Sequence, residues 1–461
     1  MLETVLAAAR AGEQQSLEHL IELCAIPSVS AQPAHARDIR HASLWLSEHL
    51  RDIGLRADMR ETAGNPIVYA EWRHPDPTRP TVLIYGHYDV QPPEPIEAWT
   101  SDPFTPTVRD GYLYARGASD NKGQFMAHVC AVESWMRTTG GLPCSVKFMI
   151  EGEEEIGGTH LGEFIARNAA LLACDVAVIS DSELLSRTQP VITQGLRGLV
   201  YLEVEARVAT RDLHSGSYGG NVQNPAMALA QILAGLKDAE GRVTVPGFYD
   251  DVRVLSVAER AELARLPFSE ANIVAETGAS MAFGEPEFTV TERRGARPTL
   301  EINGIWGGYT GPGSKTVLPA TASAKLSCRL VPNQDPATIQ ARVVDEIRRR
   351  CPPGVSLSFL FHGMSAGTLI DLDAPEIRAL QAAAQDTYGA RPLFALEGGS
   401  LPVVLDLQRA LGKPIAMLGF GLPEDNIHAP NERFAIECYA HGIEASIRFL
   451  DAIGRMPSGR A

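Results

Sequence analysis

Short apolar runs and helically spaced apolar residues alternate along roughly the first 180 residues. The runs are rich in β-branched and aromatic residues, which is typical of strands buried in the middle of a sheet. Between them, apolar residues recur every three to four positions, which predicts helices. The predicted strands are residues 67–72, 81–85, 145–150 and 175–180, and the predicted helices are residues 38–53, 122–136 and 161–173. This alternation predicts an α/β fold with a mostly parallel sheet and helices on both faces.

The pattern changes near residue 197. Residues 201–209 alternate charged with apolar side chains, as a half-exposed antiparallel strand does. Further strands and two helices of this kind follow, and the less regular stretch 240–298 is interpreted as an insertion. The predicted strands are residues 300–305, 322–330 and 355–361, and the predicted helices are residues 225–236 and 336–350. The middle of the chain therefore predicts a smaller α+β domain.

Helix and strand alternate again from residue 374 to the last predicted helix at 436–453. One α/β domain, made of residues 1–197 and 367–461, is therefore expected to be interrupted by an inserted domain at 198–366. The N-terminal segment predicts one amphipathic helix that ends near Pro27. It lacks a basic stretch followed by an apolar one, so no signal peptide is expected.

Composition narrows the classes of partner. The chain of 461 residues has a net charge of -15, which argues against binding to nucleic acid or to an anionic membrane. Its seven cysteines are scattered and odd in number, as expected of reduced thiols that are mostly buried. No apolar window approaches the length of a membrane span. We therefore expect a cytoplasmic protein without a membrane or nucleic-acid partner.

The stretch EGEEEIGG, residues 151–158, places four carboxylates within five residues directly after a predicted strand. Like charges at this spacing raise one another's pKa and destabilise the fold unless a cation or solvent offsets them. Two interpretations follow from the stretch alone: a solvated acidic turn, or part of a cation site. The choice depends on whether other strands end in similar residues.

Two other predicted strands also end in residues of metal-ligand type. His87 and Asp89 follow one strand, and Asp181 follows another, while Asp120 lies in a glycine-containing loop between two of the strands. Taken singly, His87 fits a structural histidine, Asp120 a helix cap and Asp181 a turn residue. Together with EGEEEIGG they predict one site, because ligands of α/β sheets bind outside the carboxyl ends of the strands.

Six motifs then occur in an order and at a spacing that resemble the M20 family of dinuclear zinc metallopeptidases. The resemblance spans almost the whole chain, and within the family the chain is similar to the carnosinase-like dipeptidase branch. The six motifs are GHYDV, SDNKGQ, EGEEEIGG, ISDS, DLHSG and IHAPNE, and the stretches shared with the dipeptidase branch are RLVPNQ, GSKTVLP and PGFYDD.

The resemblance implies two metal ions per subunit, bridged by Asp120. It assigns His87 and Asp181 to one ion, and Glu155 and His428 to the other. Imidazole and carboxylate ligands suit Zn2+, with Mn2+ or Co2+ as alternatives. Such a pair of ions activates a water molecule and polarises the scissile carbonyl.

The same resemblance makes Glu154 the general base, which takes a proton from water and passes it to the leaving amine. Asp89 is then expected to orient the imidazole of His87. Position 153 is also glutamate in this chain, so a shift of one residue would make Glu153 the base instead. The flanking residues Gly152 and Ile156 favour Glu154 as base and Glu155 as ligand.

The middle domain is expected to act as a lid and dimerisation domain that holds the substrate. Arg329 matches an arginine that grips the substrate's terminal carboxylate, although a structural salt bridge would explain it equally. Thr316 and Ser400 match smaller polar contacts, with an ordinary turn as the alternative for Ser400. His214 matches a histidine that reaches the active site of the partner subunit, although loop histidines are more often solvated. The resemblance thus implies a homodimer.

The expected activity is hydrolysis of dipeptides or similar short peptides with a free C-terminal carboxylate. The alternatives are an N-acyl- or N-carbamoyl-amino-acid amidohydrolase and a non-catalytic metal-binding scaffold. The presence of Glu154 together with all five ligand positions argues against the scaffold. The remaining histidines, His19 and His49 among them, are interpreted as surface or core residues.

Overall fold

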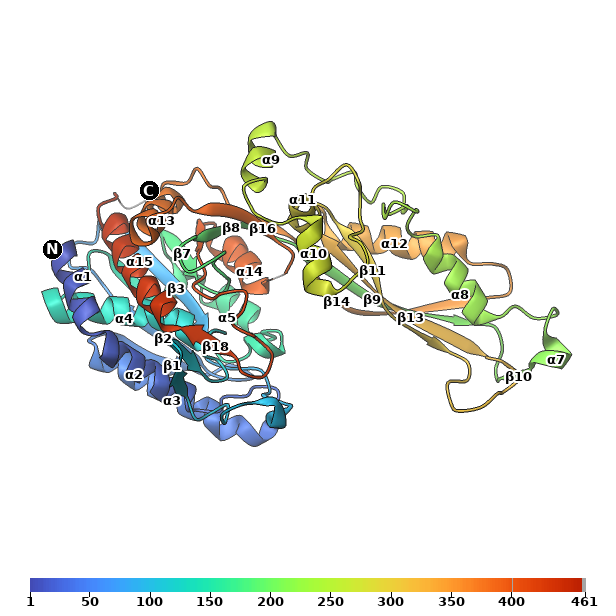
Figure 1. Ribbon diagram of the computed structural model, residues 1–461, viewed down its shortest axis with the longest axis horizontal. Helices are drawn as coiled ribbons and strands as arrows, with labels where there is room; N and C mark the ends of the chain where they lie inside the picture. The colour runs from blue at the N-terminus through green and yellow to red at the C-terminus, as the bar shows by residue number, and fades with distance from the viewer. Residues whose placement is uncertain (400, 458–461) are drawn as a thin grey trace. The chain divides into compact units, whose positions relative to one another are not determined.

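The computed structural model describes residues 1–399 and 401–457, and the chain divides into two compact units (Figure 1). Unit 1 comprises Met1–Gln194, Ile370–Phe394 and Pro402–Ala461. Unit 2 comprises Gly195–Leu369 and Ala395–Leu401. Unit 1 is therefore built from three separate stretches of chain, and unit 2 is inserted into it.

A twisted six-stranded sheet forms the centre of unit 1 in the described residues. Its strands, in order across the sheet, are β1 (Arg56–Arg60), β2 (Ile67–Trp72), β6 (Ser145–Glu151), β3 (Thr81–His87), β7 (Val176–Ile179) and β17 (Ile415–Met417). The pairs β6–β3, β3–β7 and β7–β17 are parallel, whereas β1–β2 and β2–β6 are antiparallel. The α/β fold class with a mostly parallel sheet is confirmed.

The register of the parallel strands brings the predicted ligand segments together. His87, the last residue of β3, pairs with Glu151, the last residue of β6. On the other side of β3, Tyr85 pairs with Ile179, the last residue of β7. The loops after all three strands therefore leave the sheet at the same edge.

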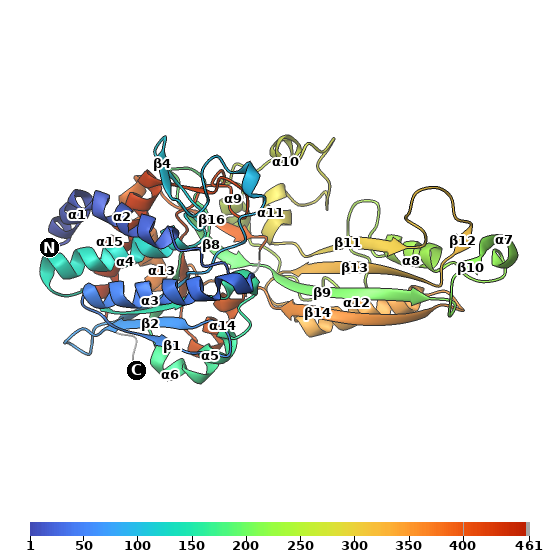
Figure 2. The same ribbon diagram turned by 90° about the horizontal axis from the view of Figure 1, so that it is seen from below.

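Helices cover both faces of this sheet (Figure 2). One layer consists of α3 (Ala36–Asp52), α4 (Lys122–Thr139), α13 (Pro375–Tyr388) and α15 (Ile436–Gly454), and the other of α5 (Leu161–Arg167), α6 (Ala169–Leu172) and α14 (Pro402–Leu411). Gly86 lets α4 approach β3 closely, because a Cβ atom there would collide with Phe125. Gly140 ends α4 in the left-handed conformation with φ of 73°.

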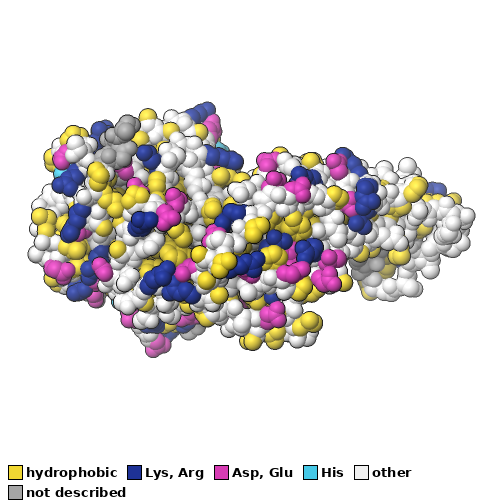
Figure 3. All heavy atoms as spheres, turned by 90° about the horizontal axis from the view of Figure 1, so that it is seen from above, with side chains coloured by type: hydrophobic (Ala, Val, Ile, Leu, Met, Phe, Trp, Pro, Cys, Tyr) yellow, Lys and Arg dark blue, Asp and Glu magenta, His cyan; other side chains and the backbone are white. Residues whose placement is uncertain are grey.

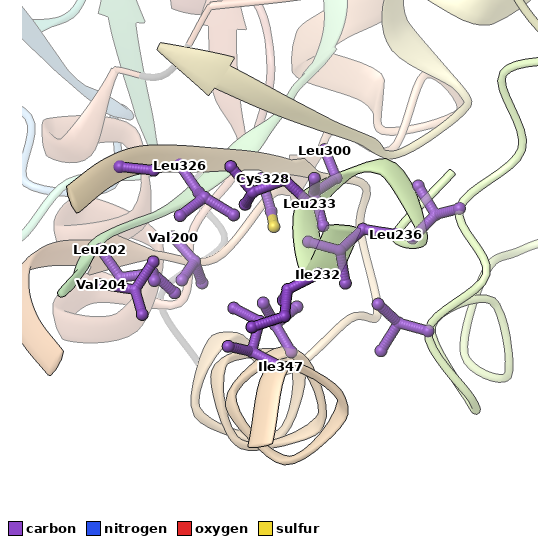
Figure 4. Packing of buried hydrophobic residues seen from close by; sticks show 14 of the residues in the cluster. Val200, Leu202, Val204, Ile232, Leu233, Leu236, Leu300, Leu326, Cys328 and Ile347 are labelled. Carbon is purple, nitrogen blue, oxygen red and sulfur yellow. The ribbon is translucent and has the colours of Figure 1, made fainter. Parts of the chain in front are cut away.

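Unit 2 contains a four-stranded antiparallel sheet with α8 (Pro225–Ala234) and α12 (Pro336–Arg350) packed beside it. The strand order is β11 (Thr299–Gly307), β13 (Thr321–Leu330), β9 (Gly198–Arg207) and β14 (Ser356–Ser365). Alternate residues of β9 and β13 point toward the helices and are almost completely buried, as Figure 4 shows for Leu202, Leu326 and their neighbours. Each large apolar side chain buried here contributes about 1.5–3 kcal/mol.

Several helix boundaries differ from those predicted. The N-terminal segment forms two helices, α1 (Leu2–Ala11) and α2 (Glu13–Cys24), because Gly12 leaves the helical conformation. The helix predicted at 161–173 is likewise divided at Asn168, whose φ and ψ of -113° and 21° are not helical.

The stretch 240–298, predicted to be irregular, contains three short helices. They are α9 (Val257–Leu263), α10 (Glu270–Thr277) and α11 (Val290–Gly295). Each begins with a capping box, in which a serine or threonine side chain and the side chain three residues later satisfy each other's backbone N–H groups. The spacing Ser-x-x-Glu or Thr-x-x-Glu was therefore the signal in the sequence that marks two of these helices.

The remaining elements are short. The strands are β4 (Thr107–Arg109), β5 (Tyr112–Tyr114), β8 (Val191–Leu196), β10 (Leu213–His214), β12 (Val317–Leu318), β15 (Thr368–Leu369), β16 (Leu393–Glu397) and β18 (Arg433–Ala435), and the helices are α7 (Ser215–Tyr218), η1 (Pro33–His35), η2 (Ile96–Ala98) and η3 (Glu154–Ile156). Among the described residues, no helix combines the length and apolar character needed to cross a bilayer. On the face shown in Figure 3, basic and acidic side chains are interspersed.

Candidate metal centre

Two groups of potential metal ligands lie at the edge of the unit 1 sheet and share Asp120. His87 Nε2 lies 3.1 Å from Asp120 Oδ1 and 3.8 Å from Asp181 Oδ2. His428 Nε2 lies 2.9 Å from Asp120 Oδ2 and 3.3 Å from Glu155 Oε2. Within each group the ligand atoms lie within 4.8 Å of one another. The structure thus brings together all five residues that the sequence placed around two metal ions.

The carboxylate of Asp89 connects the loop after β3 to the acidic stretch after β6. It accepts hydrogen bonds from the backbone N–H groups of Glu154 and Glu155, at 3.3 and 3.1 Å. These amides belong to the first turn of η3, where N–H groups have no partner within the helix. Asp89 therefore fixes the backbone from which both side chains project.

Asp89 also fixes the orientation of the His87 ring. Its backbone carbonyl lies 3.1 Å from His87 Nδ1, and its carboxylate Oδ1 lies 3.5 Å away. An Nδ1–H donated to the backbone carbonyl leaves Nε2 as the atom that faces Asp120 and would bind a metal ion after losing its proton. Nε2 is buried and has no hydrogen-bond partner among the described residues.

Glu432, in the motif IHAPNE, holds the loop that carries Asp120. Its fully buried carboxylate accepts hydrogen bonds from the backbone N–H groups of Gly117, Ser119 and Asp120, at 2.9 to 3.0 Å. Arg116 Nη1 lies 2.7 Å from the same carboxylate. In the described residues this loop is therefore positioned by a residue more than 300 positions away in sequence.

The other ligands are supported by neighbouring amide side chains. Asn121 Nδ2 donates to Asp181 Oδ1 at 2.9 Å, and Gln91 Nε2 donates to Glu155 Oε2 at 2.8 Å. His428 has φ of 59°, a left-handed conformation that side chains other than glycine and asparagine rarely adopt. Each ligand side chain is thus held by a specific contact or backbone conformation.

The four carboxylates of EGEEE have separate surroundings. Glu151 accepts a hydrogen bond from the Tyr85 hydroxyl at 2.7 Å. Glu153 pairs with His160 Nδ1 at 2.7 Å and accepts the Asn65 N–H at 3.0 Å. Both carboxylates are therefore engaged outside the ligand groups, which leaves the next two glutamates, 154 and 155, for the metal centre.

Burial and crowded negative charge perturb the acids of this centre. Burial raises the pKa of Asp181 to about 8, against the opposing effect of His87. Burial also raises the pKa of Glu154, and the nearby Glu155 and Asp120 carboxylates add to the rise. Hydrogen bonds to Asp120 and Glu155 raise the pKa of His428 to about 10. Asp181 and His428 therefore retain protons at neutral pH that a bound cation would displace.

The residues fit a pair of divalent cations. Each group offers one imidazole nitrogen and carboxylate oxygens from two residues, a mixture that suits zinc and other first-row ions. The Nε2 atom of His87 is buried 3.1 Å from Asp120 Oδ1 without a well-directed hydrogen bond, and a metal ion between the two atoms would satisfy both.

The site residues predicted in the middle of the chain lie in unit 2. His214 is exposed, and its Nδ1 accepts the Gly216 N–H at 3.1 Å, so the neutral ring carries its proton on Nε2. Val317, the neighbour of Thr316, pairs with His214 across β10 and β12, and the Thr316 carbonyl accepts the Ser215 N–H at 3.1 Å. His214 and Thr316 therefore lie in the same part of unit 2.

Arg329, near the end of β13, has an arginine neighbour that the sequence did not single out. Burial and the positive charges of Arg329 and Arg294 together lower the pKa of Arg197 to about 10, against the opposing effect of Glu301 and Glu397. These positive charges favour an anion nearby, and the Glu397 carboxylate already pairs with Arg294 at 3.1 Å. The change of pattern near residue 197 was the signal for Arg197. Ser400 lies outside the described residues.

The residues that position the ligands could not be identified from the sequence pattern. Asn121 and Glu432 both stand inside motifs that were recognised, directly beside or near a predicted ligand. Their roles depend on contacts with Asp181 and with the Asp120 loop, and local pattern does not reveal such contacts.

Comparison with known proteins identifies relatives over nearly the whole chain. The family model described as "Peptidase family M20/M25/M40" matches residues 83–452. A Cys-Gly metallodipeptidase of Schizosaccharomyces pombe is 31% identical over 449 residues, which cover 94% of this chain and 94% of the relative. A Beta-Ala-His dipeptidase of Rattus norvegicus is 29% identical, over 97% of this chain and 94% of the relative.

A solved structure is also similar throughout. It is an M20 family metallo-carboxypeptidase from Sulfolobus solfataricus, with a TM-score of 0.84 and 34% identity. The match covers 96% of this chain and 99% of that structure. Sequence and fold thus agree on one group of relatives.

Proposed function

Because this chain belongs to peptidase family M20/M25/M40, we propose that it is a metal-dependent dipeptidase that hydrolyses dipeptides or similar short peptides with a free C-terminal carboxylate. The observation that carries the proposal is the sharing of Asp120 between two groups of ligands. Two dipeptidases among the relatives support the choice of substrate class.

We assign His87 and Asp181 to one zinc ion, Glu155 and His428 to a second, and Asp120 to both. Mn2+ and Co2+ are alternatives for the same ligands. When bound, such a pair of ions polarises a carbonyl oxygen and lowers the pKa of a bound water molecule to about 7. The protein's own contribution is to hold the ligands, which Asp89, Asn121 and Glu432 do through the contacts described above.

Glu154 is proposed as the general base. Its carboxylate can accept a proton from water and return that proton to the leaving amine. The hydrogen bond from its N–H to Asp89 holds its backbone at the edge of the sheet. Because Glu154 belongs to neither group of metal ligands, its carboxylate is available for this role.

The substrate's carboxylate is proposed to bind the arginines of unit 2, with Arg329 as the principal contact and Thr316 and Ser400 as smaller polar contacts. Arg197 supports this assignment because its charge adds to that of Arg329. A planar guanidinium group binds a carboxylate through two parallel hydrogen bonds. The domain at 198–366 is accordingly proposed to act as a lid.

His214 is proposed to stabilise the developing oxyanion in the active site of a partner subunit, so the active form is a homodimer. Its Nε2–H is the donor that such a role requires. Large apolar side chains exposed on the edge strands β11 and β14 support an interface in unit 2, among them Trp306, which is 44% exposed, and Phe361, which is 50% exposed. We also propose a cytoplasmic location, on the scattered cysteines.

Two adjacent substitutions test the assignment of the base. Glu154→Gln should retain its metal ions and reduce kcat by about 10²–10⁴, because a general base is lost. Glu153→Gln is the matched control, since its carboxylate contacts His160 and Asn65 instead. Metal content and steady-state rates should be measured for both. Equal activity of Glu154→Gln and the native enzyme, or a larger loss in Glu153→Gln, would refute the assignment.

A panel of substrates tests the activity itself. The similarity to a metallo-carboxypeptidase favours one alternative, removal of the last residue from longer peptides. N-acyl- and N-carbamoyl-amino acids represent the amidohydrolase alternative. A dipeptidase should have its highest kcat/KM on dipeptides, and a preference for tripeptides or N-acyl-amino acids would reject it.

A further inference from the structure

A second cluster of metal-ligand residues lies among the helices of unit 1, away from the sheet edge. Cys130 and Glu133 are three residues apart on α4, so they project from the same face of that helix. His19, on α2, joins them, and the three ligand atoms lie within 4.8 Å of one another. His49, on α3, lies beside His19 with ring centroids 4.6 Å apart. Three helices thus contribute to one cluster.

The cluster is largely enclosed. Cys130 and Glu133 are 1% and 6% exposed, and the side chain of His19 is 16% exposed. His49 stacks on the Trp45 ring, with centroids 5.0 Å apart and planes 5° from parallel. These contacts hold both imidazole rings in place.

The hydrogen bonding of the cluster is incomplete. In the part of the chain that the structure describes, His19 Nδ1 and His49 Nε2 are buried and have no hydrogen-bond partner. His19 Nδ1 lies 3.5 Å from Glu133 Oε2, a separation that a shared ion would bridge. The second oxygen, Glu133 Oε1, lies 2.5 Å from Arg137 and is already paired. Buried nitrogens without partners are rare unless a ligand satisfies them.

We propose that His19, Cys130 and Glu133 bind a zinc ion, and that His49, whose ring lies beside His19 but whose nitrogens lie outside their ligand group, turns toward the ion as the fourth ligand. One thiolate, two imidazole nitrogens and one carboxylate oxygen are a tetrahedral set of donors that zinc prefers. Binding releases the thiol proton of Cys130 to solvent, and it also releases one proton from His19, because the neighbouring Cys130 and Glu133 raise the pKa of that imidazole to about 10. The Tyr439 hydroxyl lies 3.2 Å from the Cys130 sulfur and donates its proton to the Ser16 carbonyl at 3.1 Å, so it would have to turn from Ser16 to donate to the thiolate.

This ion would stabilise the fold and take no part in the hydrolysis. Cys130 follows Lys122, the first residue of α4, by eight positions, or about 12 Å along the helix axis. The proposed catalytic ligands lie near the N-terminal end of α4, where Asp120 precedes the helix. Four protein ligands leave no open coordination position, as in a structural zinc site. Such an ion would connect α2 and α3 to α4.

Cobalt loading distinguishes this site from the catalytic one, because the proposed catalytic ligands include no sulfur. The purified full-length enzyme should be stripped with a chelator, loaded with Co2+ and examined by absorption spectroscopy and metal analysis. The native protein should show a near-ultraviolet thiolate-to-cobalt band. Cys130→Ala should lose the band and one equivalent of cobalt, while it keeps the visible cobalt bands of the catalytic centre and its activity.

Cys144→Ala is the matched control, because Cys144 is also fully buried but belongs to no ligand group in the described residues. His19→Gln should lose the same band, which keeps the proposal testable if Cys130→Ala does not fold. Native protein with visible cobalt bands but no thiolate band would overturn the proposal. A band that persists in His19→Gln, or disappears in Cys144→Ala, would overturn the ligand set.

Discussion

Replacing Glu432 with glutamine should weaken metal binding without touching a metal ligand. The native carboxylate accepts three backbone hydrogen bonds from the loop that carries Asp120 and pairs with Arg116. Glutamine has one carbonyl oxygen to share among these donors, and its NH2 group faces at least one of them. It also leaves the Arg116 charge buried without its partner, since Arg116 is 1% exposed.

The expected loss can be worked out from these contacts. Breaking a buried ion pair by removing one charge costs about 3–5 kcal/mol. The four contacts are not additive, so we take this range for the whole substitution and do not sum them. The substitution should also displace Asp120, because its loop loses hydrogen bonds. The affinity for metal should then fall by about 10–100-fold, as is usual when a ligand's supporting contact is lost.

Two measurements check this prediction. The first is the Kd for Zn2+, from competition with a chromogenic chelator at pH 7. The second is the free energy of unfolding of the metal-free protein in urea. Glu424→Gln is the control, because Glu424 is exposed and adjacent to the same motif. A folded Glu432→Gln protein that binds zinc with native affinity would refute the view that Glu432 positions Asp120.

Three further outcomes are expected. The pKa of Asp181 is raised to about 8 in the metal-free folded protein, above its value near 3.9 in the unfolded chain. The protonated carboxyl group therefore stabilises the fold fully below about pH 4, and this stabilisation is lost as pH rises to about 8. Metal-free protein should therefore melt at a lower temperature at pH 8 than at pH 6, and zinc should remove the difference; a higher melting temperature at pH 8 would contradict this. Leu326→Ala should destabilise unit 2 by about 2–5 kcal/mol in urea unfolding, because Leu326 is fully buried, whereas Val254→Ala, at an 84% exposed position, should change stability by about 0.5 kcal/mol or less. His214→Ala should lower kcat by about 10²–10³, and mixing it with Glu154→Ala should restore part of the activity if subunits exchange; native activity of His214→Ala would reject the role in the partner's site.

Local pattern determined the α/β class and the edge of the sheet where the candidate site lies. Alternation between strand and helix predicts parallel strands, and parallel strands necessarily end at the same edge. His87, Asp181 and the acidic stretch after residue 150 could therefore be placed together before any contact was known. Helices with weak apolar periodicity, such as α9 to α11, were missed because only their capping boxes mark them.

The tertiary structure decided which of the adjacent glutamates belongs to a group of candidate metal ligands. Glu153 contacts His160 and the backbone N–H of Asn65, whereas Glu155 contacts His428. No sequence periodicity relates these partners to the glutamates. The same holds for Glu432 and the Asp120 loop. Such contacts join residues from 7 to 312 positions apart and depend on strand register and helix packing. The sequence by itself determined where along the chain the acids stand, and only the folded chain decided which partner each carboxylate has.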